Sequence, residues 1–261
     1  MAFTQNNGVK IYWREAGQGE PLLMIMGLGY TAAMWHHIED ALAQHYRLIM
    51  FDNRGVGQSD VPPSGYQISD MAADAAVVLD AADVSSAHVF GFSMGGYIAQ
   101  ELTLNNPERV QSLILGSTSF GGDKAILASQ EVLDLLQARK TMSPEEGTHA
   151  LVSTVYHPTT PKERLDADFA IRLANFPSAQ GYSAQLEAIQ KWSSFDRLEQ
   201  LKANTLVLHG DSDMLVPTQN GYLLASALPN AQLEIVRDAS HVLFTDQPEK
   251  TVSSILKFLR D

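Results

Sequence analysis

Gly91-Phe92-Ser93-Met94-Gly95-Gly96 carries the strongest structural signal in this sequence. The apolar segment 87–90 before it predicts a strand, and residues 97–104 after it have helical spacing. A serine with glycines two residues away on either side, at a strand-to-helix turn, has the form of a nucleophile elbow. Glycine suits these positions because a side chain there would collide where strand and helix approach each other. A Gly-rich turn whose serine only caps the helix explains this stretch equally well when it is taken alone.

Strands and helices alternate on both sides of this turn. Segments 3–5 and 9–13 flank Asn7-Gly8, which favours an antiparallel hairpin at the start of the fold. Further apolar runs, several of them continuous as in strands buried on both faces, predict strands at 21–26, 47–51, 110–116, 204–210 and 232–236. Helices are expected at about 31–45, 68–82, 218–227 and 248–259. This alternation predicts an α/β fold, with a mostly parallel eight-stranded sheet and helices on both faces.

The alternation stops between residues 118 and 201. No strand is convincing there, and helical stretches are expected at about 125–140, 144–155, 161–175 and 178–191. Such a length of helix between two strands is far beyond an ordinary crossover. We therefore expect one α/β core formed by residues 1–117 and 202–261, with residues 118–201 as a helical cap.

Composition excludes several classes of function. The net charge of −12 argues against nucleic-acid binding, which needs clustered Lys and Arg, and no apolar run is long enough to span a membrane. The chain has no cysteine, which rules out disulfides and a cysteine nucleophile. No signal peptide is recognisable in the first residues, and we expect a cytosolic protein. No metal-ligand cluster or phosphate loop is visible, so neither a metal nor a cofactor is expected.

A catalytic serine needs a base to accept its proton and a carboxylate to orient that base. His241 is the expected base, because it lies in a loop after a late strand and before the closing helix; His209 is the weaker candidate. Asp211 and Asp213 both follow the strand 204–210, and the residues alone do not choose between them. The remaining histidines fall in helices, in the expected cap or inside a strand: His36, His37, His45, His88, His149 and His157.

Five motifs in this order resemble the α/β-hydrolase superfamily over nearly the whole chain: Met26-Gly27-Leu28-Gly29, Asp52-Asn53-Arg54-Gly55-Val56-Gly57-Gln58-Ser59, the serine turn, Gly210-Asp211-Ser212-Asp213-Met214-Leu215-Val216-Pro217 and Ser240-His241. Small esterases, 3-oxoadipate enol-lactonase-like hydrolases and cofactor-free haloperoxidases are the most similar members. The resemblance implies that Asp213 is the acid, which gives the triad Ser93, Asp213 and His241. It also implies an oxyanion hole made of the backbone amides of Leu28 and Met94, although Met26-Gly27 stands where many relatives have His-Gly.

The substrate pocket is harder to locate from sequence. Tyr30, Tyr97, Val216 and Leu243 flank the catalytic loops and are expected to form its wall, together with Trp192 from the cap. A substrate that carries a carboxylate would need a cationic clamp, for which the cap offers Arg139, Lys140, Arg172 and Lys191.

These features predict a serine hydrolase that cleaves an ester or lactone of a small, largely apolar molecule, with no nucleic-acid or membrane partner. Homo-oligomer formation is left open. Enol-lactonase and haloperoxidase or perhydrolase activity would use the same triad. A non-catalytic binding protein on this scaffold is an alternative from another class. So is a dinucleotide-binding oxidoreductase, because Gly27-Leu28-Gly29-Tyr30-Thr31-Ala32 is followed about 20 residues later by Asp52.

Overall fold

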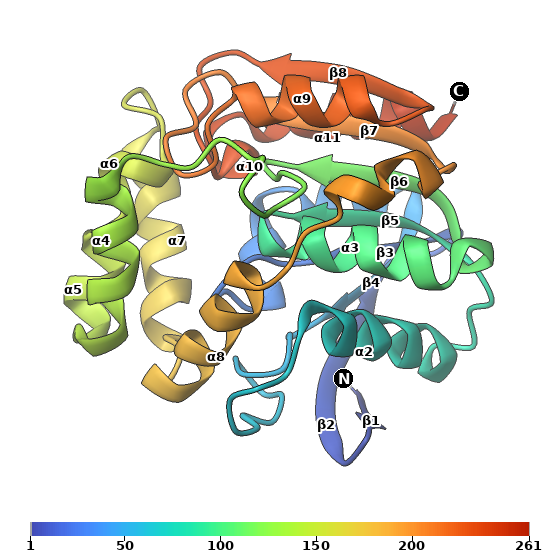
Figure 1. Cartoon of the computed structure of the whole chain (residues 1–261), viewed down its shortest axis with the longest axis horizontal. Helices are drawn as coiled ribbons and strands as arrows, with labels where there is room; N and C mark the ends of the chain where they lie inside the picture. Colours follow the sequence, from blue (N-terminus) through green and yellow to red (C-terminus); the bar gives the residue numbers. More distant parts are fainter. Residues whose placement is uncertain (1, 261) are drawn as a thin grey trace.

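The computed structural model describes residues 2–260, which form a central sheet covered by helices (Figure 1). The sheet has eight strands in the order β1-β2-β4-β3-β5-β6-β7-β8. β1 and β2 form the expected hairpin, β2 also pairs antiparallel with β4, and all other neighbours are parallel. The strands are β1 (Ala2–Asn6), β2 (Val9–Ala16), β3 (Glu20–Ile25), β4 (Tyr46–Phe51), β5 (Ala87–Phe92), β6 (Val110–Gly116), β7 (Asn204–Gly210) and β8 (Ala231–Val236). The predicted α/β fold is confirmed.

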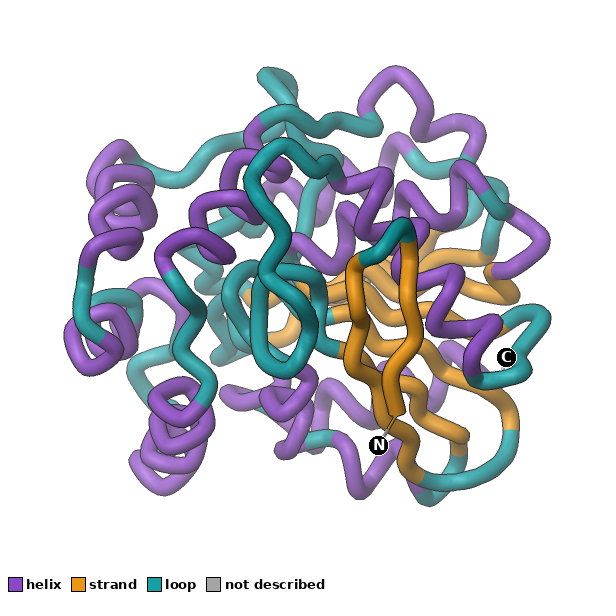
Figure 2. The backbone as a smooth tube through the Cα atoms, turned by 90° about the horizontal axis from the view of Figure 1, so that it is seen from below, coloured by secondary structure: helices purple, strands orange, loops and turns teal. Residues whose placement is uncertain are grey.

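Helices cover both faces of this sheet. α2 (Ile68–Ala81), α3 (Met94–Asn105) and α9 (Gln219–Ala227) bury apolar side chains against one face, where they form the first hydrophobic cluster. The 3-10 helix η1 (Ala32–His37), α1 (Glu39–Ala43) and α11 (Pro248–Arg260) contribute to the second cluster, on the other face. Successive residues of β3 point alternately into the two clusters, as a strand buried on both faces requires. Figure 2, which views the molecule from below, shows the β1–β2 hairpin in front of the other strands.

The chain between β6 and β7 is helical. It contains α4 (Gln130–Ala138), η3 (Arg139–Thr141), α5 (Pro144–His149), α6 (Val152–Val155), α7 (Lys162–Ala174), α8 (Ala179–Gln190) and η4 (Phe195–Gln200). In Figure 1 most of these helices, α4 to α7 above all, gather at one side of the sheet. Within residues 118–201 the structure has no strand of the main sheet, although Gly121 and Ser193 make one isolated bridge.

Several predicted helices differ in extent from the observed ones. The helix expected at 31–45 is split into η1 and α1 at Ile38, and the helix expected at 144–155 is split into α5 and α6 at Leu151. Both residues are buried in the second hydrophobic cluster, so tertiary packing overrides local helix propensity. α4 begins at Gln130 and not near 125, because Ser129 caps it and the buried Asn220 side chain hydrogen-bonds both the N–H and the carbonyl of Ile126.

A buried ion pair fixes the loop that follows β4. The Arg54 guanidinium donates to both carboxylate oxygens of Asp74 on α2, at 2.6 and 2.7 Å, and the Asn6 amide donates to one of them at 2.8 Å. Both charged side chains are almost completely buried. These hydrogen bonds therefore join β1, the loop after β4 and α2. No helix within residues 2–260 combines the length and the hydropathy that a membrane crossing requires.

Candidate active site

The serine turn joins β5 to α3 and holds Ser93 in an uncommon backbone conformation, with φ 55° and ψ −121°. Helix and strand come so close here that a Cβ on Gly91 would lie 2.3 Å from the carbonyl oxygen of Gly95, and one on Gly95 would lie 2.1 Å from that of Ile25. Backbone atoms cannot yield to such contacts, which explains both glycines. The Ser93 carbonyl accepts hydrogen bonds from the Gly96 N–H at 2.8 Å and the Thr118 hydroxyl at 2.8 Å, and these fix the turn.

His241 lies in the loop between β8 and the short helix α10 (Leu243–Asp246). Its Nε2 lies 3.0 Å from Ser93 Oγ, within hydrogen-bond reach. The loop is held from both ends, because the Ser240 N–H donates to Asp246 at 2.7 Å and the Val242 N–H donates to the carbonyl of Val155 at 2.9 Å. The imidazole is therefore presented to the serine by a fixed backbone.

Asp213 lies on the other side of the same imidazole. Its Oδ2 is 2.9 Å from His241 Nδ1, while its Oδ1 accepts the N–H groups of Leu215 and Val216 at 2.9 and 2.8 Å. Burial opposes its ionisation, but the charge of His241 and hydrogen bonds from two imidazoles hold the pKa of this carboxyl well below its usual value. Asp211 is exposed and accepts from the Ser212 hydroxyl at 3.0 Å. Of the two acids, Asp213 is the one beside the histidine.

The second imidazole belongs to His209, which the sequence offers only as a weaker base. It is completely buried, and its Nε2 lies 2.8 Å from the carbonyl oxygen of Val216 and 3.2 Å from Asp213 Oδ2. Since a carbonyl only accepts, Nε2 carries the proton and points it at Val216 and Asp213. His209 thus braces the acid and has no contact with Ser93.

The backbone beside Ser93 offers amide donors. Met94 is the first residue of α3, so its N–H has no partner within the helix. Leu28 belongs to the loop after β3, and this loop packs so tightly that a Cβ on Gly27 would lie 3.0 Å from Ser93 Cβ. Ser93, Leu28 and Met94 line one cavity together.

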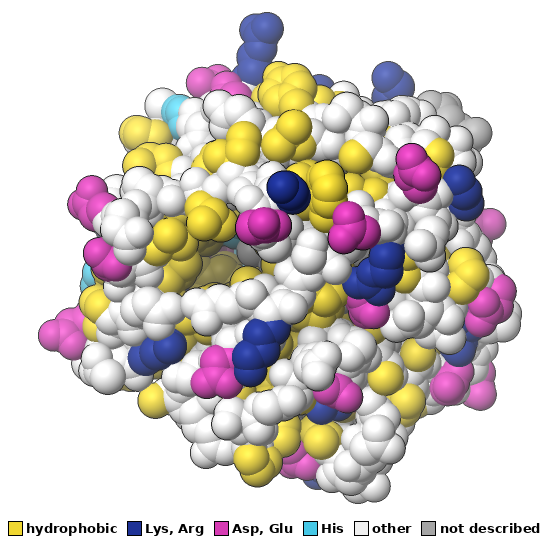
Figure 3. Space-filling model, in the orientation of Figure 1, with side chains coloured by type: hydrophobic (Ala, Val, Ile, Leu, Met, Phe, Trp, Pro, Cys, Tyr) yellow, Lys and Arg dark blue, Asp and Glu magenta, His cyan; other side chains and the backbone are white. Residues whose placement is uncertain are grey.

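That cavity, here called the Ser93 cavity, has a volume of about 610 Å³. Its wall is formed by Leu28, Met94, Tyr97 and Val216, by the segment around 118–128, and by side chains of α4 and α8 that include Leu133, Leu136, Leu186 and Ile189. Figure 3 shows a hollow with hydrophobic side chains around it on the face drawn in Figure 1. Volume and lining both suit a small organic ligand with an apolar part.

The expected wall residues fall into two groups. Tyr97 and Val216 line the Ser93 cavity, and Tyr30 lines a second cavity of about 30 Å³ beside Ser93 and His241. Leu243 lies away from both, because α10 turns its side chain into the second hydrophobic cluster. Trp192 packs behind Tyr97, with ring centres 4.4 Å apart, and its indole N–H donates to Glu101 at 2.8 Å. Leu243 and Trp192 therefore line neither cavity and support the site from behind.

The candidate cationic clamp is dispersed. Arg139 donates to the Gly147 carbonyl at 3.0 Å, and beside Ser93 it lines only the 30 Å³ cavity, which has room for about one water molecule. With Lys140 it also lines a separate cavity of about 280 Å³, whose lining includes neither Ser93 nor His241. Arg172 is buried over Tyr30, and Lys191 is exposed. No Lys or Arg of the described chain lines the Ser93 cavity, whereas Asp123 and Asp134 do.

The glycine-rich loop 27–32 is unsuited to a dinucleotide. Asp52 is buried, and its two carboxylate oxygens accept hydrogen bonds from the N–H groups of Ala32 and Gln58, at 2.9 and 3.0 Å. Neither oxygen is therefore turned toward a ribose. Gly29 is covered by α8, where Gln185 accepts its N–H at 2.8 Å. Gln185 also donates to the Arg54 carbonyl at 2.8 Å and so ties the Leu28 loop in place. Nothing local in the sequence marks this role, because the partner lies 156 residues away.

Comparison with known proteins agrees with this fold. The sequence pattern of the family described as alpha/beta hydrolase fold matches residues 20–248. The chain belongs to this α/β-hydrolase family. A protein of Azorhizobium caulinodans provisionally named carbamate hydrolase RutD is 30% identical over 261 residues, which are 99% of this chain and 98% of that protein.

Solved structures are similar over the same length. The esterase RhEst1 from Rhodococcus sp. ECU1013 superposes with a TM-score of 0.88 at 26% identity, over 99% of this chain and 98% of its own. An enol-lactonase from Burkholderia xenovorans LB400 reaches a TM-score of 0.89 over all of both chains, and at 22% identity it shows the shared fold alone. This α/β-hydrolase therefore has hydrolases, an esterase among them, as relatives.

Proposed function

We propose that this α/β-hydrolase is a serine esterase that cleaves neutral esters or lactones with an apolar acyl group through an acyl-enzyme. One observation carries the proposal. The unbroken chain of contacts from Asp213 through His241 to Ser93 ends at a cavity of about 610 Å³ with a largely apolar lining. Residues 118–201 act as the cap that encloses this cavity.

The reaction follows from the contacts of the triad. His241 Nε2 takes the proton of Ser93 Oγ while the oxygen attacks the carbonyl carbon of the substrate. Asp213 holds the imidazole with Nδ1–H toward itself and stabilises the imidazolium that forms. His241 then gives the proton to the leaving alkoxide, which departs as an alcohol. A water molecule deprotonated by His241 attacks the acyl-enzyme, and the acid leaves as Ser93 regains its proton.

The tetrahedral intermediate places a negative charge on the former carbonyl oxygen. In the proposal the N–H groups of Leu28 and Met94 donate to it, because both residues line the cavity beside Ser93. Loss of one such donor lowers turnover by a factor on the order of 100 to 1000 in related sites. The two hydrogen bonds of Gln185, with the Gly29 N–H and the Arg54 carbonyl, form a bridge (the Gln185 bridge) that keeps the Leu28 loop at the required position.

Charge and volume narrow the substrate class. The leucines and isoleucine of α4 and α8 give the acyl group an apolar surface, while Asp123 and Asp134 repel a carboxylate. A neutral acyl chain fits this lining better than the carboxylate-bearing lactones for which a cationic clamp would be needed. The two relatives, named as a carbamate hydrolase and an esterase, have acyl transfer to water in common.

A panel of 4-nitrophenyl esters and simple lactones with acyl chains of increasing length tests the proposal. We expect turnover of neutral esters, and a loss on the order of a millionfold in Ser93→Ala, as in a related triad. Ser226→Ala, which removes an exposed hydroxyl of α9, is the matched control and should match the unmodified protein. If Ser93→Ala retained substantial ester hydrolysis, or if no ester or lactone were turned over, the proposal would fail.

A further inference from the structure

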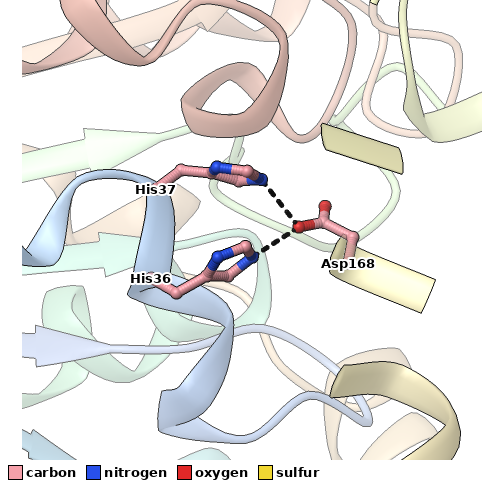
Figure 4. A group of neighbouring side chains, drawn as sticks. All are labelled: His36, His37 and Asp168. Carbon is pink, nitrogen blue, oxygen red and sulfur yellow. Dashed lines mark hydrogen bonds and ion pairs between the residues drawn. The ribbon is translucent and has the colours of Figure 1, made fainter. Parts of the chain in front are cut away.

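His36, His37 and Asp168 form a group of neighbouring side chains, none of which lines the Ser93 cavity. The two histidines end η1, and Asp168 lies in α7, 132 residues after His36. Figure 4 shows both imidazoles pointing at the same carboxylate oxygen. His36 Nε2 lies 2.7 Å and His37 Nε2 lies 3.0 Å from Asp168 Oδ1.

The remaining contacts of Asp168 fix its carboxylate in this direction. Its side chain is completely inaccessible to solvent, and its Oδ2 accepts the hydroxyl groups of Tyr156 and Thr245, both at 2.8 Å. Oδ1 is therefore left to the two imidazoles. A carboxylate held by its second oxygen while the first faces two histidines is the arrangement of an oriented metal ligand.

We propose that His36, His37 and Asp168 form a binding site for one divalent transition-metal ion, with Zn²⁺ as the best match. Two imidazole nitrogens and one carboxylate oxygen are a common ligand set for Zn²⁺, and one ligand atom from each residue lies within 4.8 Å of the others. Bond lengths of about 2.0–2.2 Å around a tetrahedral ion place ligand atoms roughly 3.3 Å apart. The distance from Asp168 Oδ1 therefore has to grow by about 0.6 Å for His36 Nε2 and by about 0.3 Å for His37 Nε2.

The surroundings give the ion access and an open coordination position. The side chains of His36 and His37 are 27% and 14% exposed, so both rings have room to shift and a water molecule can complete the coordination. His37 also lines a surface groove of about 710 Å³ beside α11, so one side of its ring lies near solvent.

Arg172 limits the affinity of this site for a metal ion. This buried guanidinium lies near Asp168, and its Nη1 is 3.4 Å from the Tyr156 hydroxyl. Its positive charge already offsets the carboxylate, so a dication gains less here than in a site with a free negative charge. We therefore expect micromolar binding, weaker than that of a closed structural zinc site.

The function of such an ion would be structural. η1 packs on the core sheet, α7 belongs to the helical segment, and Thr245 lies four residues after His241. An ion at this site would tie the helical segment to the core beside the loop that carries His241. No step of the proposed ester hydrolysis passes through it, so this inference stands independently of the proposed function.

Calorimetric titration of the chelator-treated, tag-free chain with ZnCl₂ tests the site, together with thermal unfolding. We expect one ion per chain and a rise in Tm of about 5 °C at saturating metal, because the ion binds only the folded state. Titration with Co²⁺ should add the visible d–d bands of a low-coordinate ion.

Matched variants separate this site from adventitious binding. His36→Gln/His37→Gln should abolish the stoichiometric binding, the Tm rise and the Co²⁺ bands. His45→Gln/His149→Gln removes two exposed imidazoles and should keep all three. The single variant His36→Gln, at a partly exposed position, replaces the double variant if the latter does not fold. No stoichiometric binding to the unmodified chain, or equal binding to His36→Gln, would overturn the proposal.

Discussion

At the scale of the residue, the site depends on the strained backbone of Ser93 and on the close approach of strand and helix at Gly91 and Gly95. Ser93 has a positive φ, which a serine adopts only when its surroundings impose it. Gly91 and Gly95 allow the strand and the helix to approach within backbone contact, and this approach turns the hydroxyl toward His241. A serine that only capped a helix would need neither glycine and no imidazole, so the capped-turn interpretation does not account for this geometry.

Asp213→Asn tests the acid at this scale. An amide at this position cannot stabilise the imidazolium and favours the wrong tautomer of His241, so kcat for a 4-nitrophenyl ester should fall by about 10⁴. Asp211→Asn is the matched control, since Asp211 is exposed and two residues away, and its kcat should equal that of the unmodified protein. A large loss in Asp211→Asn with a small one in Asp213→Asn would reverse the assignment.

At the scale of the element, loops fixed by buried polar groups set the shape of the site. The Arg54–Asp74 ion pair holds the loop after β4, and the Gln185 bridge connects that loop through the Arg54 carbonyl to Gly29. The carboxyl ends of β3, β5 and β7 lead into the loops that contain Leu28, Ser93 and Asp213. Because the strands from β3 to β7 are parallel, these three loops lie at the same edge of the sheet. The strands thus position the candidate catalytic groups, and buried polar contacts hold the loops that carry them.

Arg54→Met should lower the free energy of unfolding by about 3–5 kcal/mol, because it leaves the buried Asp74 carboxylate without its partner. The double variant Arg54→Met/Asp74→Leu removes both charges and should recover most of this loss. Urea denaturation, monitored by circular dichroism, measures the free energy of unfolding of the single and the double variant. Equal stability of Arg54→Met and the unmodified protein would show that the ion pair contributes nothing.

Leu133→Trp tests the role of α4 in the Ser93 cavity. The larger ring fills part of the space between α4 and α8, so kcat/KM for a decanoyl ester should fall by about tenfold or more while that for an acetyl ester stays unchanged. Leu173→Trp, at a partly exposed position of α7, is the control and should change neither value. An equal loss for both esters in Leu133→Trp would indicate damage to the fold and no acyl site at α4.

At the scale of the whole molecule, much of the architecture is readable from sequence. Continuous apolar runs predict the strands, and the order of the motifs predicts that Ser93, Asp213 and His241 meet. Both predictions are possible because each rests on short stretches of sequence. Helix ends near Ile38 and Leu151 are not readable, since burial in the core decides them. The contacts of Gln185 with Gly29 and of Asp168 with His36 are equally hidden, because these partners lie more than 130 residues apart in the sequence.

The net charge of the molecule leads to a prediction on substrate choice. The chain carries a charge of −12, and two of its carboxylates line the Ser93 cavity. A neutral butyryl ester should have a kcat/KM at least about tenfold above that of the matching hemisuccinate ester at low ionic strength. Added NaCl and the variant Asp134→Asn should both narrow this difference. A preference for the anionic ester would point to Arg139 as a carboxylate clamp.

The central claim is that Ser93 is a nucleophile activated by His241. Its most direct test is incubation with a fluorophosphonate, followed by peptide mass spectrometry and a parallel assay of ester hydrolysis. The account predicts one phosphonyl adduct per chain, located on Ser93, with activity lost in proportion to labelling, and no adduct in Ser93→Ala or His241→Ala. Labelling at another residue, or full labelling of Ser93 with ester hydrolysis retained, would contradict it.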